Sequence, residues 1–424
     1  MKKNYLFVAL CLLLLSSTLK SQWTEETNFN QVVSGLQTFN GEIYIGGNFT
    51  QRNSGTCYWS AIFDGSTFVN HTTMIGGGGI SKMEVFNGEL YATGSLNIGS
   101  TAGVYKWTGT TWNSASSYTT SHTGIYADGN DLYVGGDFGT IGKKTGTGPF
   151  TPMPALDNSN DKVKAINKYN GEIIIAGTIN DYNSVALNNI ARWDGTAWQP
   201  IGTGLDGEVK CLAVFNGELY VGGSFANAGG SPAKYIAKWN GTNWSNVGGS
   251  MTGVGYNGIR DMIVYNNMLF VVGDFTEMGG TPTKNVAMWN GVSWVSLDLT
   301  TTSNFANCVE VLNNRLYVGT FDFTSSSLYS IDLNVVGIEE GIETTHSELY
   351  VYPNPSNGIF NINLINNSDS VATIEVFNAL GDIVLSNSIN SNRIKVDIQN
   401  QQKGIYLIKV NVGNKIFYEK VVHQ

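Results

Sequence analysis

The stretch Val209-Lys-Cys-Leu-Ala-Val-Phe-Asn-Gly-Glu-Leu-Tyr-Val-Gly-Gly223 decides the fold of most of this chain. It holds two strand-like apolar runs joined by Asn216-Gly217. Asn-Gly between such runs is a strong hairpin signal, because a type I′ turn needs positive φ at both central residues. A second pair of runs follows around Asn240-Gly241, with Trp239 and Trp244 flanking it. The unit is therefore predicted to be two hairpins in series, with four short strands and two Asn-Gly turns.

This unit recurs along the chain at intervals of about 40–50 residues, a period typical of propellers and solenoids. We count seven copies, marked by Tyr44, Tyr91, Tyr133, Ile174, Tyr220, Phe270 and Tyr317. Four antiparallel strands per copy favour a β-propeller, because radial closure leaves only short, protected strand edges. The fold class is therefore predicted to be all-β, with a seven-bladed propeller over residues 22–334.

The two ends of the repeat region predict how the ring closes. The last copy runs through Cys308–Thr320 and Leu328–Asp332 and then stops before a fourth strand with its Trp. Gln22-Trp23-Thr24 supplies a strand of that kind at the other end of the region. We therefore predict that the N-terminal strand completes the last blade, and that deleting residues 22–28 destabilises the whole propeller.

The Gly-Gly pairs that end the second strand, each followed by an aromatic residue and a later Trp, resemble kelch repeats. The pairs are Gly46-Gly47, Gly135-Gly136 and Gly222-Gly223; copies two, four, six and seven lose part of the doublet. The match supports a kelch-like propeller, similar to the central domain of galactose oxidase, more than a strict kelch assignment. The resemblance implies an interaction scaffold in most cases and an oxidase in some.

The first 21 residues have the layout of a secretory signal peptide, with Lys2 and Lys3, an apolar run from Tyr5 to Leu15, and a small-residue exit at Ser21. Removing Lys2, Lys3 and Lys20 changes the formal charge from −9 to −12. This acidic balance argues against nucleic acid or anionic lipid as a partner. No later run reaches the ~20 apolar residues of a membrane helix, so no membrane span is expected.

A second domain is predicted at residues 348–424, after an acidic, pattern-free linker at 335–347. Six alternating runs separated by Asn, Gly, Asp and Ser predict a small antiparallel sandwich, which we expect to be Ig-like. Three sequence blocks begin at Leu349, Ile374 and Lys403, and they are similar to the type A C-terminal sorting domain of type IX secretion. The residues that carry the sorting motif are Pro353, Asn354, Pro355, Gly358, Gly381, Gly404 and Tyr406.

The resemblance of the tail implies an export route. Such domains carry a periplasmic protein across the outer membrane of a Gram-negative bacterium, and they are usually cleaved afterwards. The expected partner of the tail is the type IX secretion machinery, and the expected location of the mature protein is outside the cell or on the outer cell surface. The alternative is a generic adhesion-type sandwich.

Paired tryptophans five residues apart recur in four copies, and strand alternation puts both rings of a pair on one face. They are Trp107/Trp112, Trp193/Trp198, Trp239/Trp244 and Trp289/Trp294, with Phe63/Phe68 in the first copy. Because the pairs recur in blade after blade, we interpret them as packing between blades. The alternative is an aromatic platform that stacks sugars.

Cysteine does not hold the fold together. Cys57, Cys211 and Cys308 remain after cleavage of the leader, an odd number, and a blade separates the equivalent Cys211 and Cys308. We expect the latter two to be small core residues, with a reactive thiol as the alternative; Cys57 lies in a poorly matching loop and is unassigned. Asp137, Asp274 and Asn48 follow the second strand, where we expect loop capping rather than calcium binding.

Residues typical of catalysis are sparse in the sequence. His71 and His122 are the only propeller histidines, and no HExxH, GxSxG or metal-binding Cys/His motif is present. The arginines at 52, 192, 260 and 315 sit at unrelated repeat positions. We therefore predict no catalytic, cofactor-binding or metal-binding residues, and no cofactor.

The function that we expect is non-catalytic binding or adhesion by a secreted or surface-displayed monomer. Its ligand would be an extracellular glycan or protein, held by loops such as Gly223–Ala233, Gly273–Thr283 and the irregular Gly139–Asp161 region. One alternative is a secreted carbohydrate-active or oxidase-type enzyme with a site at the channel mouth; another is a structural surface component. Convergence of two or more carboxylates, or of His71 or His122 with Tyr, at one channel mouth would favour the enzyme, and an uncharged, closed mouth would count against it.

Overall fold

The computed structural model describes residues 23–71, 78–98, 101–118, 120–249, 251–252, 258–300, 305–321, 325–333, 349–352, 356, 358–364, 372–378, 382–389, 393–412 and 415–423. The predicted signal peptide at 1–21 and the predicted linker at 335–347 lie outside these residues. The described chain consists of strands, turns and loops, with no helix among these residues. It divides into two compact units, Met1–Val336 and Gly337–Gln424.

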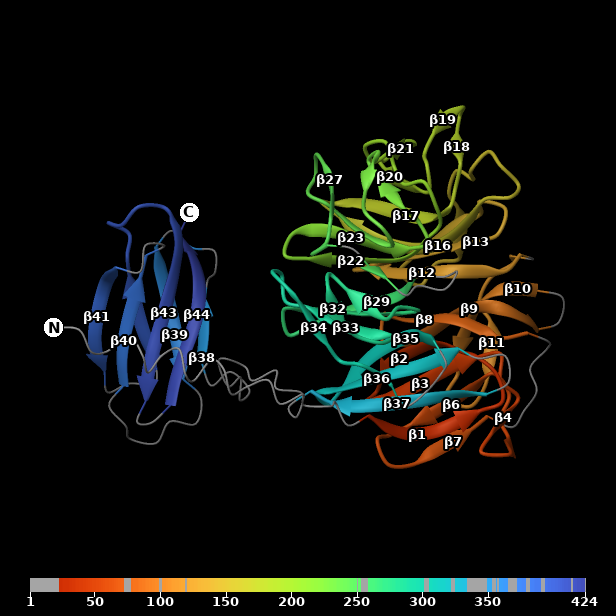
Figure 1. Cartoon of the computed structure of the whole chain (residues 1–424), viewed down its shortest axis with the longest axis horizontal. Helices are drawn as coiled ribbons and strands as arrows, with labels where there is room; N and C mark the ends of the chain where they lie inside the picture. Colours follow the sequence, from red (N-terminus) through yellow and green to blue (C-terminus); the bar gives the residue numbers. More distant parts are fainter. Residues whose placement is uncertain are drawn as a thin grey trace. The chain divides into compact units, whose positions relative to one another are not determined.

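Small antiparallel sheets make up the first unit, and the described residues form six four-stranded sheets and one six-stranded sheet there (Figure 1). The first strands of these sheets are β2 (Val33–Phe39), β8 (Ile80–Phe86), β12 (His122–Asp128), β16 (Lys162–Tyr169), β22 (Val209–Phe215), β29 (Ile259–Tyr265) and β35 (Phe305–Leu312). The second strands are β3 (Glu42–Gly47), β9 (Glu89–Ile98), β13 (Asp131–Gly136), β17 (Glu172–Thr178), β23 (Glu218–Gly223), β30 (Met268–Gly273) and β36 (Arg315–Phe321).

The remaining strands extend each sheet outward. The third strands are β6 (Ser60–Phe63), β10 (Thr101–Trp107), β14 (Ile141–Thr145), β20 (Ile190–Trp193), β26 (Ile236–Trp239), β33 (Val286–Trp289) and β37 (Ser326–Asp332). The fourth strands are β7 (Phe68–Asn70), β11 (Trp112–Ser114), β15 (Phe150–Pro152), β21 (Trp198–Pro200), β27 (Trp244–Asn246), β34 (Trp294–Ser296) and, in the last sheet, β1 (Thr24–Phe29).

Short strand pairs follow four of the second strands. They are β4 (Gln51–Arg52) with β5 (Gly55–Thr56), β18 (Asp181–Tyr182) with β19 (Val185–Ala186), β24 (Asn227–Ala228) with β25 (Ser231–Pro232), and β31 (Glu277–Met278) with β32 (Thr281–Pro282). β28 (Met251–Thr252), which precedes β29, adds a third strand to the last pair. The pair β14 and β15 lies within 139–161. The expectation of an irregular loop there is therefore wrong, because these residues complete a four-stranded sheet.

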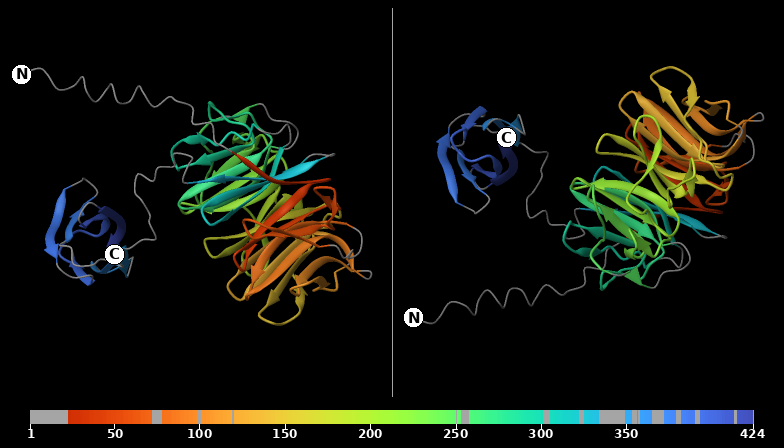
Figure 2. Two further views of the ribbon diagram at one scale, coloured as in Figure 1. Left: turned by 90° about the horizontal axis from the view of Figure 1, so that it is seen from below. Right: turned by 90° about the horizontal axis from the view of Figure 1, so that it is seen from above.

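The first strands contact one another in cyclic order. Each packs against the first strand of the next sheet, from β2 through β8, β12, β16, β22 and β29 to β35, and β35 packs against β2. These strands therefore surround a common axis. Both views of Figure 2 show the red N-terminal strand beside the cyan strands of the last sheet. This arrangement is that of a β-propeller-like fold.

In the first hairpin of the repeat the tight turn is of the type that the sequence predicts, whereas in the second hairpin it is not. Asn216 and Gly217 both have positive φ, at 50° and 76°, as a type I′ turn requires. At the second hairpin Trp239 pairs directly with Trp244, so the loop has four residues, not two. The Asn240 side chain accepts the backbone N–H of Thr242 and Asn243 there. An Asx turn thus replaces the predicted two-residue Asn-Gly turn.

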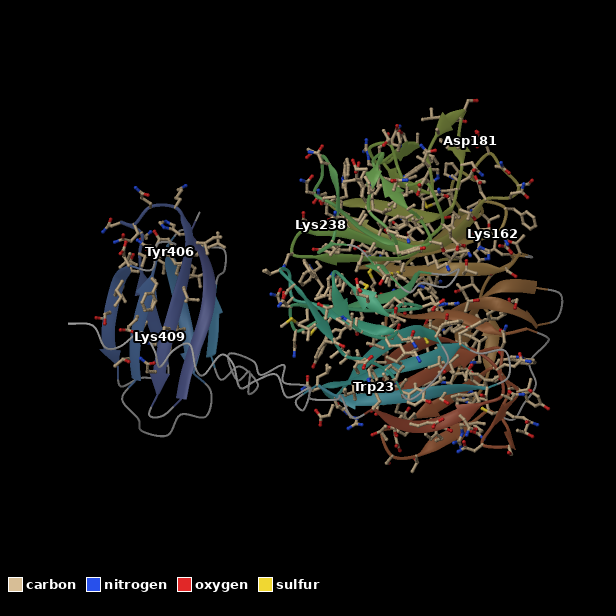
Figure 3. The ribbon with its side chains drawn as sticks, viewed as in Figure 1. Trp23, Lys162, Asp181, Lys238, Tyr406 and Lys409 are labelled. Carbon is tan, nitrogen blue, oxygen red and sulfur yellow. The ribbon has the colours of Figure 1, made fainter. Side chains whose placement is uncertain are left out.

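The ring is closed by the N-terminal strand. β1 pairs antiparallel with β37, so residues from both ends of the repeat region share one sheet. The predicted closure is confirmed, although the strand runs over Thr24–Phe29 rather than 22–24. Trp23, just before it, is buried, and its indole Nε1 donates to the carbonyl oxygen of Leu297 (Figure 3).

The tryptophan pairs join neighbouring sheets. Trp244 donates its indole N–H to the carbonyl of Ile201 at 3.0 Å, and Trp294 donates to that of Val247 at 3.1 Å. Each acceptor follows the fourth strand of the preceding sheet, so each bond crosses between sheets. Trp198 repeats the contact with Pro154, and Trp112 bonds Ser60 of the sheet before it. The interpretation as packing between sheets is confirmed.

Cysteine burial matches the prediction. Cys211 and Cys308 are each 2% exposed, and the described cysteines are free thiols. Burial raises the pKa of both thiols above the usual value. Cys57, unassigned from sequence, is also buried, and its Sγ contacts the carbonyl of Ser60 at 3.4 Å.

The second unit consists of two antiparallel sheets. One is β38 (Leu349–Tyr352), β39 (Ile359–Leu364) and β42 (Arg393–Asp397); the other is β41 (Ile383–Ile389), β40 (Ala372–Phe377), β43 (Gly404–Val412) and β44 (Lys415–His423). A single apolar core joins them, including Phe360, Ile374 and Val396. In the described parts of β39, β40, β42 and β43 alternate residues are buried in this core, as the period-2 pattern of the sequence predicts.

Candidate functional site

A β-bulge interrupts each of the seven first strands near its start. Register shifts mark all seven strands against their neighbours. A bulge leaves one extra residue unpaired and turns its side chain away from the regular alternation. The bulged residues are Ser34, Ser81, Thr123, Lys164, Lys210, Arg260 and Asn307, and all seven line one cavity of about 320 Å³. This cavity, at the mouth of the central channel, is the candidate site.

The side chains around this ring are segregated by charge. In ring order, three hydroxyl residues come first, on β2, β8 and β12, and three cations follow, on β16, β22 and β29. Asn307 on β35 separates the two groups on the far side. We call Ser34, Ser81 and Thr123 the hydroxyl arc, and Lys164, Lys210 and Arg260 the cationic arc.

Glu208 holds the two lysines of the cationic arc in place. One carboxylate oxygen forms an ion pair with Lys164, and the other lies 3.5 Å from the Nζ of Lys210. Burial raises the pKa of Glu208, but its contact with Lys164 has the larger combined effect and the pKa is lowered overall. The opposite holds at Lys210, where burial lowers the pKa of the ammonium despite Glu208. The carboxylate is therefore ionised at neutral pH.

Arg260 is fixed by stacking and by one hydrogen bond. Its guanidinium lies 4.8 Å from the ring centroid of Phe321, and its Nη1 donates to Asn307 at 2.8 Å. The Nδ2 of Asn307 in turn donates to the carbonyl of Val33. The Nε of Arg260 is buried and has no hydrogen-bond partner among the described residues. Burial lowers the pKa of Arg260, against the charges of Asp274 and Glu208.

An ion pair lies across the channel below the ring. Lys82 and Asp261 each follow a bulged residue, and they reach each other from β8 and β29 with 3.9 Å between Nζ and Oδ1. The second oxygen of Asp261 accepts the backbone N–H of Val309 at 3.2 Å. Burial raises the pKa of Asp261. The cavity is thus a cup with a ring of bulged residues as its wall and this pair as its floor.

Two further carboxylates lie further along the first strands, Glu84 on β8 and Glu310 on β35. Glu84 sits two residues beyond Lys82, so strand alternation places it on the same side of its strand, and Glu310 occupies the equivalent position on β35. Burial raises the pKa of each to about 7, and the charge of Glu310 adds to the effect at Glu84. Each accepts the backbone N–H of the next residue, at 3.2 Å for Glu84 and 2.8 Å for Glu310.

Backbone hydrogen bonds tie the loops after the second strands to this mouth. The N–H of Ser224 donates to the carbonyl of Glu208, and the N–H of Asp274 donates to that of Gly258. Asn48 and Asp137 make the same bond to Val32 and Ser121. The recurring oxygen residues therefore mark loop anchors; the Asp137 side chain pairs with Lys162 at 3.3 Å. Among the described residues no group of three or more His, Cys, Asp or Glu is placed to hold a metal ion.

The two propeller histidines have separate surroundings. The Nδ1 of His71 lies 2.5 Å from the Ser60 hydroxyl, and its ring packs on Trp107. His122 is fully buried, bonds the carbonyl of Thr120 and packs on Tyr118. Burial lowers the pKa of both, to about 4 at His71. The two histidines therefore contact different residues, and neither lines the channel cavity.

One tryptophan pair borders a second cavity. Trp239 is half-buried and lines a groove of about 340 Å³ together with Tyr169 and Arg192. Arg192 is paired there with Glu172 at 2.6 Å. The indole N–H of Trp244 is already bonded between the sheets, whereas Trp239 leaves part of its ring exposed to this groove.

The sorting residues are only partly within the described chain. Pro353, Asn354, Pro355 and Gly381 lie outside the described residues. Gly358 has φ of +93°, and a Cβ there would lie 2.8 Å from the backbone of Gln399. Gly404 starts β43. Tyr406 is buried, and its hydroxyl donates to the carbonyl of Gln402 at 2.5 Å (Figure 3).

Comparison with known families identifies the tail. Residues 350–424 match the secretion system C-terminal sorting domain. The chain therefore carries a type IX secretion sorting domain, which marks it as a secreted or cell-surface protein of the Bacteroidetes and implies interaction with the secretion machinery. No helix among the described residues is long and apolar enough to cross a membrane. No curated protein matches the chain in sequence.

Three solved structures are similar to the chain, one of them with a TM-score above 0.5. A virginiamycin B lyase from Staphylococcus aureus is 12% identical with a TM-score of 0.53, over 74% of this chain and 99% of that one. An extracellular domain assigned to a one-component system of B. thetaiotaomicron is 11% identical with a TM-score of 0.49, over 95% of this chain. PorZ of Porphyromonas gingivalis, a surface component of the type IX secretion system, is 15% identical with a TM-score of 0.40, over 92% of this chain. The chain spans 59% and 65% of the last two proteins.

The cationic arc was missed in the sequence. The arginines alone occupy unrelated repeat positions, but Arg260 is equivalent to Lys164 and Lys210 once lysines are included. The signal was available near the start of these first strands, as the middle residue of Val163-Lys164-Ala165, Val209-Lys210-Cys211 and Ile259-Arg260-Asp261. The net charge of the whole chain concealed the cationic arc. The chain is formally −9, whereas the cavity lining, with four cations and two carboxylates, is formally +2.

Proposed function

We propose that this chain is an exported binding protein whose first unit is a seven-bladed, kelch-like β-propeller. Its ligand is an extracellular glycan or protein, and the channel mouth is the place where it binds. The support is the convergence of seven bulged side chains on one open cavity. Bulges are common next to functional sites because they redirect side chains, and here every first strand has one.

The loops around the mouth extend the proposed site. The short pairs β24 with β25 and β31 with β32 occupy the expected binding loops Gly223–Ala233 and Gly273–Thr283. Backbone bonds such as that from Ser224 to Glu208 fix them to the rim of the cavity. A rigid scaffold that carries variable loops at one end is the usual arrangement of a binding surface.

A glycan array and whole-cell binding by the mature chain test this proposal. Saturable binding to at least one glycan or cell surface is expected. Trp239→Ala is the matched variant for the second cavity, and it should leave binding unchanged if the ligand sits at the channel. Absence of saturable binding to every glycan, cell and secreted protein fraction would contradict the proposal and would favour a purely structural surface component.

A second candidate is an acid–base enzyme with its site in the channel. Two observations favour it. Glu208 and Asp261 both line the channel mouth, which is the convergence of carboxylates expected of an enzyme. Glu84 and Glu310 both have a pKa raised to about 7, and catalytic acids are tuned in this way by burial. Hydrolysis assays on polysaccharides and oligosaccharides test it, with Glu84→Gln and Glu310→Gln as variants. Activity that both variants abolish would replace the binding proposal; activity that persists in both would exclude this pair.

We propose that the tail is an Ig-like sandwich that acts as a separable export signal. The bond from the hydroxyl of Tyr406 back to the carbonyl of Gln402 has the geometry of the tyrosine corner of such sandwiches. The exposed apolar side chains Ile383, Ile405 and Leu407 offer a contact surface for the secretion machinery. A fusion of residues 335–424 to a reporter should be exported in a machinery-dependent way; retention in the periplasm would contradict this.

A further inference from the structure

Every residue that lines the cavity at the channel mouth carries a polar or charged group. Its ten lining residues are all hydroxyl, amide or charged residues, without an aromatic or aliphatic side chain. Most small-molecule sites are largely apolar, so this lining disfavours lipids, peptides with apolar anchors and nucleobases that need stacking. A volume of about 320 Å³ falls at the small end of ligand pockets. The occupant should therefore be small and highly polar.

The charge of the lining selects the sign of the ligand. The four cations outnumber the two carboxylates, of which Asp261 is paired with Lys82 and Glu208 with Lys164 and Lys210. Arg260 adds a second feature, because its Nε is buried without a hydrogen-bond partner among the described residues. A buried donor without an acceptor is costly, so an oxyanion that accepts from it would be stabilised.

The separation of the hydroxyl arc from the cationic arc places a further requirement on the ligand. An anion alone would use only the cationic arc, whereas the hydroxyl arc presents three uncharged donor–acceptor groups opposite it. A molecule that carries a carboxylate at one side and hydroxyls at the other is complementary to both arcs. Glu208 and Asp261 provide further acceptors for hydroxyl groups.

We propose that the channel mouth binds one acidic sugar residue of an extracellular polysaccharide. Its carboxylate lies against Lys210 and Arg260, and its hydroxyls lie against Ser81 and its neighbours in the hydroxyl arc. This inference rests on the proposed function, because it names the ligand class of the same binding site.

Calorimetric titration of the mature chain with galacturonate and glucuronate tests the inference, with galactose, glucose and inorganic phosphate as the comparison ligands. At least one uronate should bind, at least about tenfold more tightly than its neutral counterpart, and its affinity should fall as salt is raised because the attraction is screened. Arg260→Gln and Lys210→Gln should each weaken uronate binding about tenfold or more. Lys106→Gln, which removes an exposed cation paired with Glu89 outside the cavity, is the matched control and should have no effect.

Ser81→Ala separates a sugar site from a simple anion site. It should weaken uronate binding while phosphate binding stays unchanged, because only the sugar uses the hydroxyl arc. Lys164→Gln replaces Arg260→Gln if the latter lowers the melting temperature, since Lys164 is the more exposed cation, at 32%. Phosphate that binds as tightly as every uronate, or uronate binding that survives both Arg260→Gln and Lys210→Gln, would overturn the inference.

The glycan array shows whether only the acidic-sugar inference is wrong or whether the proposed binding function is wrong as well. If the mature chain binds a neutral glycan or a protein saturably but no uronate, the acidic-sugar inference is wrong and the proposed binding function stands. If it binds nothing saturably, both are wrong.

Discussion

The indole Nε1 of Trp23 donates a 2.7 Å hydrogen bond to the carbonyl oxygen of Leu297, 274 residues further along the chain. The same bond joins Trp294 to Val247 and Trp244 to Ile201 within the repeats. Trp23 therefore takes the position in the last sheet that a repeat tryptophan takes in the others. The two ends of the repeat region are therefore joined by the same tryptophan-to-carbonyl hydrogen bond that joins neighbouring sheets.

Removing this contact should destabilise the whole propeller. Trp23→Ala is expected to lower the free energy of unfolding by about 3 kcal/mol or more, the usual cost of removing a buried aromatic side chain. Urea unfolding of the mature chain measures it. Trp294→Ala should cost a similar amount, because the contact is equivalent. Deletion of residues 22–28 should cost more than either substitution, and an unchanged urea midpoint after the deletion would refute closure by β1.

The buried carboxylates Glu84 and Glu310 should make the propeller less stable as pH rises. The pKa of each is about 7 in the folded protein and near 4.5 in the unfolded chain. Between these values the folded state binds more protons, so stability is highest below pH 4.5 with respect to these groups and falls as pH rises through 7. At pH 8 the two carboxylates are ionised, so the melting temperature should be lower than it would be with both groups protonated.

Glutamine substitutions isolate this effect. Glu310→Gln keeps the size of the side chain but cannot ionise, so it should raise stability at pH 8 relative to pH 5 by about 1–3 kcal/mol compared with the parent chain. Glu277→Gln, the same substitution on the short strand β31, is the control variant. Identical pH profiles for the parent chain and Glu310→Gln would show that the carboxylate ionises freely.

The three described cysteines should be unreactive in the folded protein. Burial raises the pKa of the Cys57 thiol to about 11 and raises those of Cys211 and Cys308, so little thiolate forms at neutral pH. Alkylation at pH 8 followed by mass spectrometry should label none of them in native buffer and all three in urea. Rapid labelling of any one in native buffer would favour the reactive-thiol alternative at that position.

Gly358→Ala should destabilise the tail and reduce export. A Cβ at this position would clash with the backbone of Gln399, and φ of +93° is unfavourable for alanine, so a loss of at least about 1 kcal/mol is expected. Secretion of the full chain into the medium, compared with periplasmic retention, is the measurement. Ser386→Ala, at an exposed position on β41, is the control. Normal secretion of Gly358→Ala would show that this turn is dispensable.

Local patterns in the sequence predicted the strands, the first hairpin turns and the packing role of the tryptophans. The reason is that strand alternation and positive φ at Asn-Gly depend on residues close together in the chain. The second turn was predicted wrongly, because Asn240 uses its side chain to accept two backbone N–H groups and thereby favours a longer loop. The strands within 139–161 were missed because their pairing partners, not their own pattern, fix them.

The sequence by itself determined that the chain is a repeat of four-stranded units joined to a type IX sorting tail, because both features are recognised from residues that are close together in the chain. Only the tertiary structure decided what the repeats bring together. Lys164, Lys210 and Arg260 are about 50 residues apart along the chain, the repeat spacing typical of propellers, and only radial closure places them on one cavity wall. A bulge turns each of them inward, and because a bulge depends on pairing with the neighbouring strand, the cationic arc exists only in the folded ring.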